Sequence, residues 1–273
     1  MVSDRSSAPI GMFDSGLGGL TVARAVIDLL PHEDLVYFGD TARTPYGPRP
    51  PQQIREFGLE IMDLLVEENV KMIVVACNSV DVTVGVDVHE RYGVPIVSVI
   101  EPGVKAGIGA TRNRRLGMIG TVATVESRAY DVAVERTKAN VFFESRSCPK
   151  FVDFVERGDT TSDALLAAAE DYLTPLKELD IDTLILGCTH YPLLSGVIQY
   201  VMGDDVVLIS SAEATANEVY AQLLDTDRLN RAERPGHQRF MLSGEPESGG
   251  ELGRRFLGPE FGHAEHRPWE AAA

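Results

Sequence analysis

The stretches MIVVACNS at residues 72–79 and TLILGCTH at residues 183–190 decide the fold of this chain. Each is a short apolar run that ends at a cysteine and passes into residues that favour the start of a helix. Continuous apolar runs of this length are typical of strands in parallel sheets, which helices cover on both faces. The sequence therefore places Cys77 and Cys188 at the carboxyl ends of two such strands.

Strand-like and helix-like patterns alternate outward from these two runs. We predict strands at residues 9–13, 34–38, 71–76, 94–99, 115–120, 140–144, 182–187 and 205–209. We predict helices at residues 19–30, 52–69, 80–91, 122–137, 161–178, 193–202 and 212–224. This alternation is typical of βαβ crossovers, so the predicted fold class is α/β, with mainly parallel sheets flanked by helices.

The end of the chain follows a different pattern. The polar segment 225–239 predicts a loop, and QRFMLSG at 238–244 predicts a late strand. We predict a last helix at 245–257 that packs on the first half of the chain. From residue 258 onwards we expect a loosely ordered tail.

Three pairs of motifs recur in the same order at almost the same offset. They are centred on Gly11 and Gly117 (117 − 11 = 106), Cys77 and Cys188 (188 − 77 = 111), and Glu101 and Glu213 (213 − 101 = 112). Strands of α/β proteins also resemble one another without common origin, but three matches in one order indicate an internal duplication.

A duplication predicts two pseudo-symmetric α/β domains with the active site in the cleft between them. We expect the first domain, on the Cys77 side, to comprise residues 1–99 plus 211–273. The second domain, on the Cys188 side, would comprise residues 100–210. Ligands of open α/β sheets bind at the carboxyl ends of the strands, which here would face each other across the cleft.

The composition excludes several classes of protein. The 273 residues carry a formal charge of −16, with lysines and arginines scattered among 41 carboxylates, so nucleic acid is an unlikely partner. No apolar run approaches the roughly 18 residues of a membrane span, and the N-terminal stretch lacks the apolar segment of a secretory signal. Three widely spaced cysteines without C-x-x-C spacing fit a reducing cytosol and leave thiols free for chemistry.

Cys77 and Cys188 are the candidates for catalysis. A thiol at the start of a helix feels the positive end of the helix dipole, so we expect the pKa of each to be lowered towards neutrality. A thiol and a thiolate on opposite sides of one carbon could take a proton from one face and return one to the other. This reaction inverts a stereocentre, and we expect the sulfurs about 7 Å apart around a bound ligand. The alternative is that each cysteine is a small buried apolar residue.

Two loops are candidates for substrate binding. The glycine-rich turn 14–19 lacks the spacing of a dinucleotide-binding motif, but Asp14 and Ser15 could hold an ammonium and a carboxylate. The segment 40–47, DTARTPYG, is either a surface loop or a lid that closes Tyr46 and Gly47 over the substrate.

The remaining polar candidates have several interpretations. His190 could assist proton transfer, cap a helix, join Cys77 and Cys188 in a zinc site, or activate a cysteine nucleophile. Glu156 follows a short apolar stretch and by default is an exposed helix carboxylate. Cys148 has no counterpart in the other half, so we predict a structural role. No lysine motif for pyridoxal phosphate is evident.

Seven motifs together resemble those of the cofactor-independent glutamate racemases, within the aspartate/glutamate racemase family. They lie in the same order and spacing between about Ile10 and Leu224: FDSGLGG, YFGDTARTPYG, ACNS, PIVSVIEPG, IGTVATVES, CPKFVDFVE and LGCTHYPLL. The resemblance implies a pseudo-symmetric two-domain enzyme, usually a homodimer, of the bacterial cytoplasm. It implies interconversion of L- and D-glutamate without a cofactor or metal, which supplies D-glutamate for peptidoglycan.

The resemblance also assigns roles by motif position. Cys77 and Cys188 match the two catalytic thiols. The residues that match the family's substrate-binding positions are Asp14, Ser15, Tyr46, Gly47, Asn78, Ser79, Thr189 and His190. The residues that match its supporting polar positions are Asp14, Asp40, Glu156 and His190. One departure is Ser79, where the family usually has threonine; its hydroxyl can still bond a carboxylate.

Two rival functions follow from the same resemblance. A racemase for aspartate or another acidic amino acid would use the same scaffold. A binding role is also open, because some members of the family are reported to bind DNA gyrase. The His190 variant of the second motif and the DSG opening favour glutamate over aspartate, and intact catalytic thiols favour an enzyme over the binding role.

Overall fold

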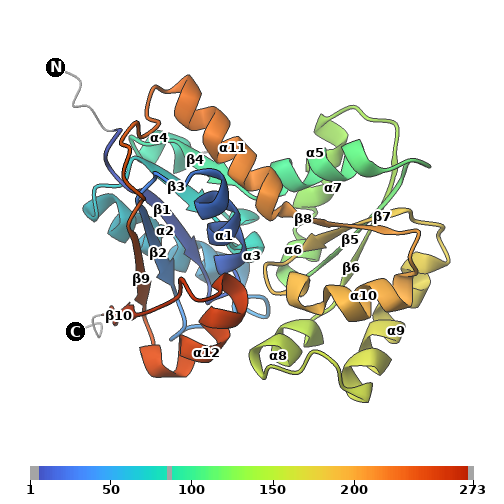
Figure 1. Cartoon of the computed structure of the whole chain (residues 1–273). Coiled ribbons are helices and arrows are strands. Elements are labelled where there is room, and N and C mark those ends of the chain that lie inside the picture. Colours follow the sequence, from blue (N-terminus) through green and yellow to red (C-terminus); the bar gives the residue numbers. More distant parts are fainter. Residues whose placement is uncertain (1–5, 85–87, 270–273) are drawn as a thin grey trace.

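The computed structural model describes residues 6–84 and 88–269, which form two parallel β-sheets flanked by helices (Figure 1). The first sheet has six strands in the order β10-β9-β2-β1-β3-β4. These are β1 (Ile10–Asp14), β2 (Leu35–Gly39), β3 (Met72–Val75), β4 (Ile96–Ser98), β9 (Gln238–Leu242) and β10 (Ala264–His266). The second sheet has the order β6-β5-β7-β8. Its strands are β5 (Arg115–Gly120), β6 (Phe142–Ser147), β7 (Thr183–Gly187) and β8 (Val207–Ser210). The predicted α/β class is confirmed.

The order of the strands repeats between the sheets. The run β2-β1-β3-β4 of the first sheet recurs as β6-β5-β7-β8 in the second, with all pairs parallel. Gly11 on β1 and Gly117 on β5 are equivalent even in packing. A Cβ atom at Gly11 would lie 2.9 Å from Val70, and one at Gly117 would lie 2.9 Å from Ile181. The predicted duplication is therefore visible in topology and in side-chain contacts.

Helices cover both sheets, close to the predicted ranges. The helices of the first part of the chain are α1 (Leu20–Leu29), α2 (Pro51–Glu67), α3 (Asn78–Asp81), α4 (Val88–Arg91) and α5 (Ile100–Ala110). The later ones are α6 (Val122–Glu126), α7 (Ala129–Arg136), α8 (Lys150–Glu156), α9 (Asp163–Lys177), the 3-10 turn η1 (Tyr191–Leu194), α10 (Ser195–Met202), α11 (Ser211–Asp225) and α12 (Pro246–Leu257).

Two predicted helices are shorter than expected. The range 122–137 is divided into α6 and α7, because Arg128 between them adopts a left-handed conformation with φ 57°. Of the predicted helix 80–91, α3 and α4 cover the two ends, and residues 85–87 lie outside the described residues.

Helix α5 is not among the predicted helices. Its sequence, IEPGVKAGIGA, contains a proline and three glycines, which normally disfavour helices. The proline is tolerated because it lies in the first turn. Two of the glycines are packing positions, since a Cβ at Gly103 would lie 3.2 Å from Ser211 and one at Gly107 would lie 2.9 Å from Ile185 on β7. The partly buried carboxylate of Asp81 accepts hydrogen bonds from the backbone N–H groups of Val99 (3.1 Å) and Ile100 (3.2 Å) at the start of this helix.

Helix α11 joins the two halves. It packs against α1 of the first half and against α5 (Figure 1). Helix α5 follows β4 in the chain, just as α11 follows β8. Val26 of α1 and Val219 of α11 are buried in one large apolar cluster that also includes Leu184 on β7. This continuous core fixes the carboxyl ends of the two sheets relative to each other.

The end of the chain returns to the first sheet. Strand β9 lies at the predicted late strand, and α12 packs on α1 of the first half, as predicted; β9 pairs with β2. The expectation of a loosely ordered tail from residue 258 is wrong for the described part of this segment. Strand β10 pairs with β9, and the Trp269 ring packs on Phe38 with a centroid distance of 5.4 Å. Aromatic packing and strand pairing fix this tail in place, and its polar sequence does not predict either of them. Within the described ranges, no helix combines the length and apolar character that a membrane crossing requires.

Candidate active site

One closed cavity lies where the carboxyl ends of the two sheets meet. Cys77 follows β3, Cys188 follows β7, and both line this cavity, whose volume is about 20 Å³. Such a space holds about one water molecule. A larger ligand therefore enters only when the surrounding loops or the two halves separate.

Nine residues that the sequence singled out line the cavity. They are Ser15, Tyr46, Gly47, Cys77, Asn78, Ser79, Cys188, Thr189 and His190. Three others that it singled out, Asp14, Asp40 and Glu156, are not among the lining residues but contact them. Asp14 accepts from Thr189 (3.4 Å), Asp40 accepts from the Tyr46 hydroxyl, and Glu156 bonds His190 (3.2 Å).

Sequence reasoning missed four residues of the lining: Thr44, Pro45, Thr121 and Val152. Thr121 carried a usable signal, because it stands 106 positions after Ser15 (121 − 15), which is the offset between the two glycines at β1 and β5. The other three carried none, since their positions depend on how loops pack.

The surroundings of Cys77 are neutral or acidic. Its Sγ lies 3.5 Å from Oγ of Ser15. Burial, followed by the nearby carboxylate of Asp14, raises the pKa of the Cys77 thiol well above its ordinary value, and the Ser15 contacts offset this only in part. The expected lowering of the Cys77 pKa is therefore wrong for the closed site. Helix α3, at whose start Cys77 lies, has only four residues, so its dipole does not outweigh desolvation.

The surroundings of Cys188 contain a charged imidazole. Nδ1 of His190 lies 3.9 Å from Sγ of Cys188, and its Nε2 lies 3.2 Å from Oε1 of Glu156. Burial lowers the pKa of His190, but the hydrogen bonds to Cys188 and Glu156 outweigh this effect and raise it to about 10. His190 is thus an imidazolium at neutral pH. The ring also packs edge-on against Phe256 of α12, with a centroid distance of 5.7 Å.

The glycine-rich turn allows the two halves to approach. A Cβ atom at Gly18 would lie 2.5 Å from Oγ1 of Thr189 and 2.6 Å from Nδ1 of His190. Any side chain at this position would collide with the Cys188 wall. The turn after β1 therefore has two roles. It allows the second half to pack closely against the first, and it places Ser15 at the cavity.

Hydrogen bonds between the halves close the cavity. Oγ of Ser79 and Oγ1 of Thr121 are 3.0 Å apart, and the Tyr130 hydroxyl donates to Oδ1 of Asn78 at 2.8 Å. The loop 40–49 is attached to the second half through its backbone, because the carbonyl oxygen of Gly47 accepts a hydrogen bond from the N–H of Ala123 at the start of α6 (3.3 Å). These bonds join the two halves beside the cavity.

Two buried polar atoms of the lining lack a hydrogen-bond partner among the described residues: Nδ2 of Asn78 and Oγ1 of Thr44. A buried polar group left unpaired costs about 1–3 kcal/mol. A polar ligand in the cavity would satisfy both atoms. The cavity is therefore suited to a small molecule with hydrogen-bonding oxygens.

The zinc alternative for Cys77, Cys188 and His190 receives no support from the geometry. Within the part of the chain that the structure describes, no group of three or more histidine, cysteine or acidic side chains is placed to hold a metal ion. All three cysteines are free thiols, and Cys148 is buried outside the cavity lining.

Two parallel sheets share one order of four strands, and each contributes a thiol to the wall of one cavity. This arrangement defines a two-domain α/β enzyme with paired thiols. The chain belongs to the Asp/Glu/Hydantoin racemase family, whose model matches residues 20–219. The glutamate racemase of Beutenbergia cavernae is 53% identical to it, covering 93% of this chain and 91% of that protein.

Solved structures show the same likeness. A glutamate racemase isoform of Bacillus anthracis superposes with a TM-score of 0.90 at 36% identity, covering 97% of this chain and 98% of that one. The Francisella tularensis glutamate racemase, solved in complex with D-glutamate, gives a TM-score of 0.89 at 33% identity, covering 96% and 98%.

Proposed function

We propose that this chain interconverts L- and D-glutamate by proton transfer between the α-carbon and two thiols, Cys77 and Cys188. The observation that carries the proposal is that sulfur atoms from equivalent strand ends line one buried cavity. The relatives described above are glutamate racemases, and one was solved with D-glutamate bound.

The reaction needs one thiolate and one thiol. The thiolate takes the α-proton, so the C–H bond breaks, an S–H bond forms, and the electron pair stays on the α-carbon next to the carboxylate. The opposite thiol then gives its proton to the other face of that carbon. The product has the opposite configuration, and the two sulfurs have exchanged protonation states. Each transfer contributes about 10²–10⁴ to the rate.

The charged groups favour a definite resting state. The imidazolium of His190 lies beside Cys188, and burial favours the neutral thiol at Cys77. We infer that Cys77 is held as the thiol, and that the His190 imidazolium would stabilise negative charge on the Cys188 sulfur during the reaction. Glu156 keeps His190 protonated, which supports its assignment as a supporting residue.

Substrate recognition follows from the unpaired polar atoms. Nδ2 of Asn78 is a donor suited to a carboxylate oxygen, and the hydroxyls of Ser15, Thr44 and Thr189 lie on the same cavity. Asp14 precedes Ser15 and accepts a hydrogen bond from Thr189, and its carboxylate would attract the substrate's ammonium group towards these two residues.

The wider assignments are part of the proposal. The two sheets support the division into a first domain of residues 1–99 plus 211–273 and a second of 100–210. Free cysteines support a cytoplasmic location. By analogy with the family, the enzyme would act as a homodimer and supply D-glutamate for peptidoglycan.

The experiment compares initial racemisation rates on D-glutamate and D-aspartate by circular dichroism. We expect kcat/KM to be at least a hundredfold higher for D-glutamate. A preference for aspartate would overturn the substrate assignment in favour of the rival acidic amino-acid racemase. Inactivity on both would overturn the proposal itself.

A further inference from the structure

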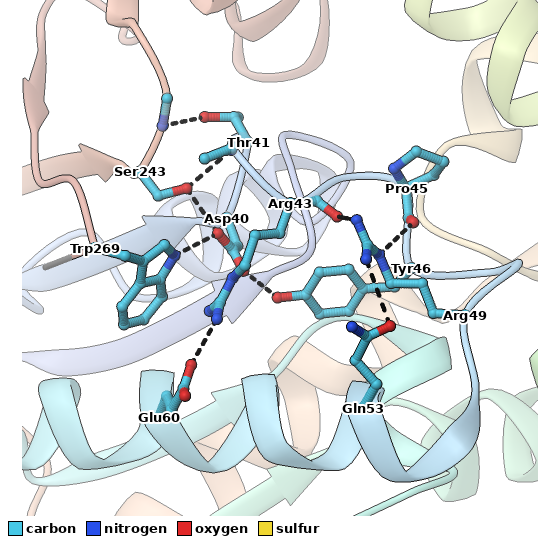
Figure 2. A network of polar contacts seen from close by, with 12 residues as sticks. Asp40, Thr41, Arg43, Pro45, Tyr46, Arg49, Gln53, Glu60, Ser243 and Trp269 are labelled. Carbon is cyan, nitrogen blue, oxygen red and sulfur yellow. Dashed lines mark hydrogen bonds and ion pairs between the residues drawn. The ribbon is translucent and has the colours of Figure 1, made fainter. Parts of the chain in front are cut away.

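The carboxylate of Asp40 is fully buried and is saturated with hydrogen bonds (Figure 2). Its Oδ1 accepts from Oγ of Ser243 (2.7 Å) and from Nε1 of Trp269 (2.8 Å). Its Oδ2 accepts from Nε of Arg43 (2.6 Å) and from the hydroxyl of Tyr46. A carboxylate has about four acceptor positions, so none remains for a substrate or a thiol. Any influence of Asp40 on catalysis is indirect.

The four donors come from two distant parts of the sequence. Arg43 and Tyr46 belong to the loop 40–49, which contributes Thr44, Pro45, Tyr46 and Gly47 to the cavity lining. Ser243 and Trp269 belong to the returning end of the chain, after β9 and β10. Asp40 thus connects the end of the chain to the wall of the active site.

Trp269 contacts the same loop a second time. The guanidinium carbon of Arg43 lies 4.0 Å from the centroid of the Trp269 ring and 3.8 Å from that of Phe57. Nη1 of Arg43 lies 2.5 Å from Oε2 of Glu60 on α2. The Trp269 indole therefore contacts both Asp40, whose carboxylate binds Tyr46, and Arg43, which lies in the loop 40–49.

Tyr46 is the element through which this arrangement reaches the cavity. Its side chain is buried and its hydroxyl is turned towards Asp40 (Figure 2), so the residue faces the ligand site with its ring and backbone. Burial and the Asp40 carboxylate raise the pKa of Tyr46, which therefore stays a neutral donor. If Asp40 turns, Tyr46 and the following Gly47 lose their fixed position.

We propose that Trp269 is a positioning residue for the substrate loop. Its indole N–H and ring hold Asp40 and Arg43, and through them the segment 44–47 at the wall of the cavity. The end of the chain is thereby part of the substrate-binding site, although it does not line it. This inference rests on the proposed function, because the loop is assigned there to glutamate binding.

The test replaces the N–H while keeping the ring. Trp269→Phe retains aromatic contacts with Phe38 and Arg43 but removes the donor to Asp40. We expect KM for D-glutamate to rise about tenfold with kcat changed less than about threefold, since one hydrogen bond to a charged group is lost. Ser243→Ala removes the other donor to the same oxygen and should raise KM in the same way.

The matched control lies on the same terminal segment. Glu265→Gln on β10 removes an ion pair with Arg239 (3.0 Å) but no contact with Asp40, so KM should stay unchanged. If kcat falls and KM changes only in proportion to a lower melting temperature, the role of Trp269 is merely structural and the inference is overturned. An unchanged KM in both Trp269→Phe and Ser243→Ala would also overturn it.

A second readout uses the wild-type protein alone. Trp269 is the single tryptophan of the chain, so its emission reports on this contact without labelling. We expect D-glutamate to change the emission with a midpoint close to KM, and a flat titration would contradict the coupling. Racemisation by the wild type is measured first. If that activity is present and these tests fail, only this inference falls; if it is absent, the proposed function falls as well.

Discussion

The surroundings of the two cysteines differ far more than the strands that carry them. Cys77 and Cys188 follow equivalent strands in sheets with the same strand order. Yet Cys77 lies beside a serine hydroxyl, and burial raises the pKa of its thiol. Cys188 instead lies beside the imidazolium of His190. The duplicated backbone places a cysteine from each half on one cavity, and the neighbouring side chains make the two positions electrically unequal. The proposed inversion needs the paired positions, and their unequal surroundings determine which sulfur is better suited to carry negative charge.

The largest expected effect comes from removing either sulfur. Cys77→Ser and Cys188→Ser should each lower kcat for racemisation by at least about 10²–10⁴, because a serine hydroxyl is a far weaker acid and base. Cys148→Ser is the matched control, since this third buried cysteine is outside the lining and should leave the rate near that of the wild type.

The same variants test whether the thiols act on opposite faces. Enantiomers have equal free energies, so kcat/KM must remain equal in the two directions, and a directional loss appears only in isotope exchange. We expect each cysteine variant to lose α-proton exchange with deuterated water mainly from one enantiomer. Equal residual exchange from both enantiomers in both variants would contradict the assignment, as would a ligand-bound crystal structure with sulfurs far from the expected 7 Å separation.

Removing the imidazolium should weaken one side of the pair. His190→Asn keeps a polar group beside Glu156 but no positive charge, so negative charge that forms on the Cys188 sulfur loses its neighbouring cation. We expect about a 10- to 100-fold fall in exchange from the enantiomer that Cys188 deprotonates, and a smaller fall for Glu156→Gln. Equal losses from both enantiomers would show that His190 does not distinguish the two sulfurs.

The raised pKa of His190 also predicts how stability depends on pH. The folded protein binds this proton more tightly than the unfolded chain, since the pKa is about 10 instead of 6.5. The stabilisation is complete below pH 6.5 and is lost as the pH rises through about 10. Urea unfolding of the wild type and His190→Asn at pH 6, 8 and 10 should therefore show a stability difference that shrinks with pH. A constant difference would refute the shift.

The smallest expected effect probes the duplicated backbone itself. Gly11→Ala places a Cβ 2.9 Å from the stiff side chain of Val70, and Gly117→Ala places one 2.9 Å from the mobile end of Ile181. We expect a loss of about 2–3 kcal/mol for the first and about 1 kcal/mol for the second in urea unfolding. Equal losses, or the reverse order, would show that the stiffness of the facing side chain does not determine the cost.

The sequence predicts the fold well where short-range patterns decide it. Apolar runs that end at Cys77 and Cys188 define strand ends, and strand ends of parallel sheets determine where a ligand binds. Helix α5 is different, because Pro102 and its glycines oppose helix formation locally and are compensated by tertiary packing, including that on β7 and α11. Tertiary contact overrides local propensity there.

The site is predictable to the extent that it repeats. Ser79 and His190 occupy matching positions after the cysteines (190 − 79 = 111), and Thr121 matches Ser15. Thr44 has no such counterpart, and its place in the lining depends on the fold of its loop. The same holds for Trp269, whose polar neighbours in sequence gave no sign that it reaches Asp40.

The return of residues 238–269 to the first sheet has a consequence for biosynthesis. The ribosome releases β1 and β2 early, but β2 has its outer neighbour only after β9 has emerged. Until then the nascent chain presents an open strand edge, which invites pairing with other chains. The second sheet needs no such late segment, so it can complete its strand pairing while the amino-terminal half still awaits the last part of the polypeptide.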